Sequence, residues 1–118
     1  MWGERVLDRE IANGLEEFIS LIERGDFFEA HEILEAVWHK SRAVNHPERL
    51  LIKGLINGAI AFEHIKRGRK NSLKCSQITM GSYMRYRDMC NPSIRNFKLF
   101  REACSAIDNH RYKKIINK

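Results

Sequence analysis

The chain has 118 residues with a formal net charge of +6, and 43% of them are hydrophobic, which fits one compact domain over residues 1–118 and argues against a disordered or fibrous chain. The longest apolar runs, such as residues 59–62, are far shorter than the roughly 18 residues of a membrane span, and the N-terminus lacks the apolar block of a signal peptide. We therefore expect no membrane partner. Three cysteines without paired spacing indicate reduced thiols, so we also expect a cytoplasmic protein.

Apolar residues recur every three or four positions along most of the chain, which is the spacing of amphipathic helices. The first such stripe ends at Gly25, a residue that suits a helix end. Asp26, followed by Glu29 three residues later, predicts a capping box at the start of a second helix. Pro47 suits the first position of a third helix, which ends at Gly68. The predicted helices span about 7–24, 26–42, 47–67, 72–89 and 94–107.

The predicted fold class is all-α, because no segment alternates polar and apolar residues over the length of a strand. We expect a compact bundle of about five helices built from helical hairpins. The third helix is expected at its centre, since residues 50–65 are apolar on nearly every side. Gly54 and Gly58 lie four positions apart and would let a neighbouring helix approach closely.

A line of polar residues interrupts this apolar third helix. At about 100° per residue, Lys53, Asn57 and His64 share one line, with Arg67 at its edge. Buried polar groups need partners, and the second helix offers them, because His31 lies on the rim of its apolar face. If the two helices pack side by side, they enclose a polar pocket. Its predicted residues are His31, Glu32, Glu35, Trp38, Lys53, Asn57, His64 and Arg67.

The cluster of histidines and carboxylates supports several interpretations. A histidine with a glutamate four residues later is most often a satisfied core residue that fixes helix register. The preferred functional hypothesis is a non-enzymatic binding or scaffold module, whose pocket takes a small ligand or a protein partner of unknown identity. A His31, Glu35 and His64 set could instead bind a divalent transition metal, the cofactor otherwise being unknown.

A second hypothesis is a small metal-assisted hydrolase that uses His31, His64, Glu32 and Glu35. No spacing matches a known ligand motif such as H-E-x-x-H, so whether the protein is an enzyme stays open. Surface or loop positions are predicted for the remaining histidines, His39, His46 and His110.

Charge is unevenly distributed along the chain. Residues 1–63 carry 7 basic and 12 acidic side chains, whereas residues 64–118 carry 14 and 3. A basic C-terminal half could bind nucleic acid, which makes a third hypothesis. The halves could equally neutralise each other within one chain, the interpretation we favour, or pair between chains in a homo-oligomer.

Two blocks of sequence resemble a known family. GDFFEAHEILE at 25–35 with Trp38, and LIKGLI at 51–56 with His64 and Gly68, are similar to the small helical family called domain of unknown function 309. The resemblance covers about residues 15–75. It implies an all-helical domain in which the FEAHE helix packs on the G-L-I helix, and it implies no established activity. The residues that carry the family signature are His31, Glu32, Trp38, Gly54, His64 and Gly68.

Overall fold

Five α-helices make up the part of the chain that the structure describes, so the all-α prediction is confirmed. The structure is a computed structural model that describes residues 2–68 and 70–111. No strand occurs within these ranges, and no helix in them is both long and apolar enough to cross a membrane. The helices are α1 (Trp2–Arg24), α2 (Phe27–Ala43), α3 (Arg49–Arg67), α4 (Ser72–Tyr86) and α5 (Phe97–Arg111), with a 3₁₀ turn η1 (Arg87–Met89) after α4.

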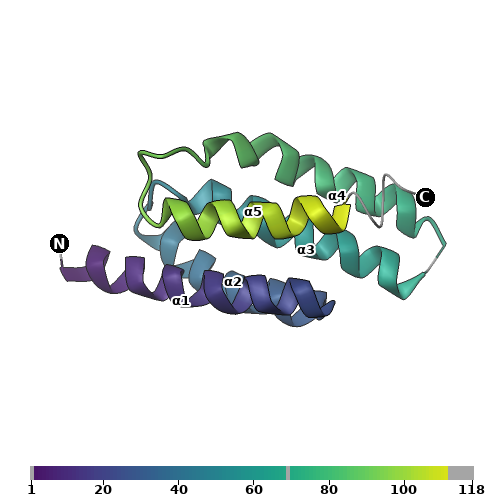
Figure 1. Ribbon diagram of the computed structural model, residues 1–118, viewed down its shortest axis with the longest axis horizontal. Coiled ribbons are helices and arrows are strands. Elements are labelled where there is room, and N and C mark those ends of the chain that lie inside the picture. The colour runs from purple at the N-terminus through teal and green to yellow at the C-terminus, as the bar shows by residue number, and fades with distance from the viewer. Residues whose placement is uncertain (1, 69, 112–118) are drawn as a thin grey trace.

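Helix α3 lies at the centre of the bundle, as predicted. Helices α2 and α4 flank it, α5 packs across it, and α1 packs against α2 and α5 (Figure 1). The bundle is elongated, with principal extents of 46 × 24 × 23 Å. The α1 stripe supplies much of its core, because each of its members is buried: Leu7, Ile11, Leu15, Phe18 and Ile22.

Three details of the predicted helix boundaries are wrong. Asp26 makes no side-chain cap for α2, because its carboxylate pairs with Arg24 at 3.3 Å. Helix α3 begins at Arg49 instead of Pro47, which lies in the preceding turn. Helix α5 begins at residue 97 instead of 94, because Asn96 has a φ of 58° and cannot continue a right-handed helix.

The glycines of α3 allow close helix approach, as their spacing predicts. A Cβ at position 54 would lie 3.1 Å from the Cβ of Tyr86 in α4, and one at position 58 would lie 3.1 Å from Cδ1 of Ile107 in α5. Both glycines are buried. A larger residue at position 54 would press on α4 close to its backbone, whereas one at position 58 would first displace the Ile107 side chain.

A buried tyrosine joins α4 to α5. The hydroxyl of Tyr83, which is fully buried, lies 3.0 Å from the carbonyl oxygen of Cys104 and 2.8 Å from Oδ1 of Asp108. Asp108 also accepts a hydrogen bond from Arg87. Burial is the main cause that raises the pKa of the Tyr83 phenol above its ordinary value, and burial likewise raises the pKa of the Cys104 thiol to about 12.

We therefore expect stability to fall in alkaline solution. Unfolding returns the thiol and the phenol to ordinary pKa values of 9.0 and 10.0, so the unfolded chain loses protons that the folded chain keeps. The stabilisation is complete below about pH 9 and declines above it, by up to about 1.4 kcal/mol per pH unit for each group. Urea unfolding at about pH 7, 9 and 10.5 measures the decline.

The variants Tyr83→Phe and Cys104→Ala each remove one titrating group. Each should flatten the dependence of the unfolding free energy on pH above about pH 9, whatever it costs at neutral pH. A free energy that stays constant up to about pH 11 in the unmodified protein would show that these groups titrate alike in both states.

Candidate functional site

A pocket of about 220 Å³ lies between the first turns of α2 and the last turns of α3. It brings together His31 and His64, which the sequence predicted to come from adjoining helices, and Arg67. Helix periodicity puts each imidazole on the edge of its helix that faces the other helix. The full lining is Phe27, Phe28 and His31 from α2, and Ile60, Glu63, His64 and Arg67 from α3.

His31 is held on both of its ring nitrogens. Nδ1 lies 3.2 Å from the carbonyl oxygen of Phe28, and Nε2 lies 2.8 Å from Oε2 of Glu35, one turn further along α2. Both partners are acceptors, so both contacts are hydrogen bonds only when the ring carries two protons. Glu35 therefore positions His31 from outside the pocket. The imidazole presents a fixed face to the pocket.

His64 differs from His31 in having free ring nitrogens. It forms no hydrogen bond or ion pair with a residue in the part of the chain that the structure describes, yet it lines the pocket. Beside it, Nε of Arg67 donates to Oε2 of Glu63 at 2.9 Å, and the guanidinium carbon lies 5.9 Å from the ring centroid of Phe28. The charges of Arg67 and Glu63 offset each other, so His64 is a neutral hydrogen-bonding group of the pocket whose ring nitrogens have no partner among the described residues, beside the terminal N–H groups of Arg67.

The other predicted pocket residues lie elsewhere. Nζ of Lys53 lies 4.5 Å from the ring centroid of Trp38, nearer the other end of α3. Asn57 turns to α4, where its Nδ2 donates to Oγ of Ser82 at 2.7 Å. Glu32 is exposed to solvent. The predicted cluster therefore divides into the α2–α3 pocket, a separate tryptophan and lysine contact, and two residues that belong to neither.

Sequence reasoning missed the apolar floor of the pocket. Phe28 is 46% exposed and looks like a surface residue by periodicity, but its ring lies 5.5 Å from that of His31. Ile60 lies on the same side of α3 as His64, four residues before it. The sequence did contain a sign of the Glu63–Arg67 ion pair, because these residues lie four positions apart, the spacing of a helical ion pair.

The geometry gives no support to the predicted metal site. Among residues with described side chains, no three or more His, Cys, Asp or Glu side chains are arranged to hold a metal ion. The set of His31, Glu35 and His64 therefore stays a prediction from sequence, as does the metal-assisted hydrolase built on it.

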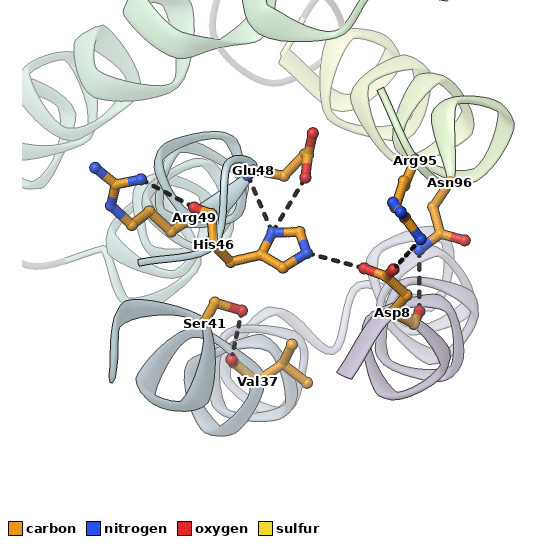
Figure 2. A network of polar contacts seen from close by, with 8 residues as sticks. All are labelled: Asp8, Val37, Ser41, His46, Glu48, Arg49, Arg95 and Asn96. Atoms are coloured by element: carbon orange, nitrogen blue, oxygen red, sulfur yellow. Dashed lines mark hydrogen bonds and ion pairs between the residues drawn. The ribbon is translucent and has the colours of Figure 1, made fainter. Parts of the chain in front are cut away.

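His46 lies in the loop between α2 and α3, as predicted, but it is not an ordinary surface histidine. Its side chain is only 5% exposed, and Figure 2 shows it between two carboxylates. Nε2 lies 2.9 Å from Oδ1 of Asp8 in α1, and Nδ1 lies 3.1 Å from Oε2 of Glu48. His39 is exposed, as predicted, whereas His110 is partly buried against the rings of Phe27 and Phe62.

The contacts around His46 join three separate segments of the chain (Figure 2). Asp8 also accepts a hydrogen bond from Arg95 at 2.9 Å through Oδ2, and its backbone oxygen accepts one from Asn96 at 3.0 Å. The cluster thereby fastens α1 to the turn before α3 and to the loop before α5. Both ring nitrogens of His46 are occupied, so we assign this histidine a structural role.

Comparison with known proteins agrees with the sequence resemblance. No curated protein and no solved structure matches the chain. Residues 15–74 match one family, and this segment contains every residue that lines the α2–α3 pocket, whereas Asp8 and Arg95 lie outside it. The match spans more than half of the chain, which therefore belongs to the family described as domain of unknown function (DUF309).

Proposed function

We propose that the protein is a binding module whose α2–α3 pocket holds a small organic ligand. The observation that carries this proposal is the pocket's combination of an open imidazole, His64, with an aromatic floor made by Phe27 and Phe28. Small-molecule sites in proteins are typically apolar clefts with a few well-placed polar groups. The ligand's apolar body packs on the two rings, and its polar group hydrogen bonds His64.

The size and the fixed parts of the pocket restrict the ligand. A volume of about 220 Å³ is below the range of roughly 300–1,000 Å³ for drug-sized ligands, so the occupant is compact, on the scale of one substituted ring. His31 is held by two partners and Arg67 by Glu63, so little side-chain ordering is needed on binding. These features favour binding over hydrolysis, which would also require an activated nucleophile.

Three probes that share a benzene ring test this proposal: benzoate, benzyl alcohol and benzylamine. Their polar groups are an anionic carboxylate, a neutral hydroxyl and a cationic ammonium, so titration calorimetry and ligand-observed NMR reveal both whether the pocket binds and which kind of polar group it prefers. We expect binding of at least one probe, and a loss of affinity of roughly tenfold in His64→Ala and in Phe28→Ala. Phe28 is exposed and His64 has no hydrogen-bond partner among the described residues, so both changes should alter stability by less than about 1 kcal/mol.

Two control variants match these changes outside the pocket. His39→Ala removes an exposed imidazole from α2, and Ile78→Ala removes an apolar side chain that is 69% exposed on α4. Both should bind the probes as the unmodified protein does. The proposal fails if none of the three probes binds, or if the control variants weaken binding as much as the pocket variants do.

A further inference from the structure

A second feature of the polar line on α3 lies away from the pocket. Trp38 of α2 lies close to two cationic side chains: Nζ of Lys53 is 4.5 Å from its ring centroid, and Cζ of Arg42 is 5.5 Å from it. Cations at this distance from an indole ring are attracted by its π electrons. Neither cation forms an ion pair with any residue whose side chain is described. The indole thus lies beside two positive charges that pair with no carboxylate among the described side chains.

An aromatic residue of α4 also packs on α3 beside Lys53. Tyr86 of α4 packs directly over Gly54, the residue next to Lys53, and Cζ of Arg85 lies 5.9 Å from the Tyr86 ring centroid. Arg85 likewise makes no ion pair within the described part of the molecule. We use the name Trp38 platform for these two groups on neighbouring helices: Trp38 and Arg42 on α2, Lys53 on α3, and Arg85 and Tyr86 on α4.

The charge around this platform is one-sided. Helix α4 contains no Asp or Glu, and the chain as a whole carries a net charge of +6. Elsewhere on α2 a cation is neutralised, since Nζ of Lys40 lies 2.8 Å from Oε2 of Glu10. The basic surface is thus not confined to the C-terminal half that the sequence singled out. Cations that are exposed or partly exposed also occur on α2, α3 and α4, namely Arg42, Lys53 and Arg85, and α3 packs against both α2 and α4 (Figure 1).

We propose that the Trp38 platform binds single-stranded nucleic acid. Interleaved aromatic rings and cations are what an unpaired strand needs, because its bases are free to stack on rings while its phosphates meet Lys and Arg. A duplex keeps its bases stacked internally, and an acidic peptide would use the cations but not the rings. This function is separate from ligand binding at the α2–α3 pocket, since the two sites share no residue.

Fluorescence anisotropy with labelled oligo-dT and oligo-U of about 12 nucleotides tests the proposal. Arg42→Gln and Lys53→Gln should each weaken binding by at least about fivefold and lower the slope of log K against log salt by about 0.7. Lys40→Gln is the matched control: it removes one positive charge from the same helix, two residues from Arg42, and should change affinity less than about twofold. Trp38→Leu should weaken binding while leaving the salt slope unchanged.

The comparison probes are a duplex of the same length and a poly-glutamate peptide of similar charge. Both should bind clearly more weakly than the single strands. The proposal is overturned if the single strands do not bind, if Lys40→Gln weakens binding as much as Arg42→Gln does, or if poly-glutamate binds equally well. Circular dichroism of each variant verifies its fold, and Arg42 and Arg85 are exposed, so at least one platform variant remains folded.

Discussion

Replacing His46 with alanine is expected to lower the free energy of unfolding by about 3 kcal/mol. The imidazole lies between two carboxylates whose side chains are themselves largely buried, Asp8 at 14% exposed and Glu48 at 9%. Removing the ring takes the imidazole partner from the Asp8 carboxylate, which keeps Arg95, and leaves the buried backbone N–H of Glu48 without its Nδ1 acceptor. Losing the partner of a buried polar group costs more than the contact itself contributes. Urea unfolding at neutral pH measures the difference directly.

Two further variants distinguish the loss of these particular contacts from the effect of removing any histidine side chain. His39→Ala removes an imidazole that is 61% exposed and should change stability by less than about 0.5 kcal/mol. In an Asp8→Ala background the carboxylate that contacts Nε2 is already gone, so His46→Ala should cost clearly less than it does alone. A His46→Ala protein as stable as His39→Ala would contradict the structural role assigned to the cluster.

Gly54→Val should destabilise the fold by about 2–3 kcal/mol. The new side chain would meet Tyr86 Cβ at 3.1 Å and the Cα of Tyr83 at 3.6 Å, so it must push α4 away from α3. Because backbone atoms of α4 cannot rotate aside as a flexible side chain can, the strain spreads along the α3–α4 contact. Thermal and urea unfolding of the variant measure the loss.

Gly81→Ala provides a matched control on the facing helix. A Cβ at Gly81 meets nothing within 4 Å, and its helical position means that alanine should stabilise the protein by about 0.5–1 kcal/mol. The two glycine variants should therefore change stability in opposite directions. If both stabilise the protein, the close approach of α4 to α3 at Gly54 is not a constraint on the fold.

Helix positions could be predicted from the sequence because the spacing of apolar residues identifies the face of each helix that is buried. The α1 stripe and the central α3 were found in this way, and both are buried. Helix starts were predicted less well. Pro47 and Asp26 are favourable first residues, but tertiary contacts of the turns decide where the hydrogen-bonded helix begins. Asparagines could have marked the helix boundaries, because Asn45, Asn71 and Asn96 all adopt a positive φ next to one.

The functional site could be predicted only as far as helix faces determine it. Periodicity placed His31 and His64 on edges that meet, because α2 and α3 are adjacent in sequence and pack as neighbours. Periodicity could not predict that Asn57 hydrogen bonds with α4, because the local sequence does not determine which neighbouring helix a polar side chain contacts. The contact between His46 and Asp8 spans 38 residues, so no spacing rule indicates it.

Nuclear magnetic resonance of the histidine side chains tests the central claim most directly. The chain has five histidines, and long-range ¹H–¹⁵N spectra follow the ring nitrogens of each during titration with whichever benzene probe binds most tightly. The account predicts that the nitrogens of His64 shift most and those of His31 shift less, while His39 and His46 stay unchanged. Shifts at His39 or His46 with His64 unmoved would contradict it.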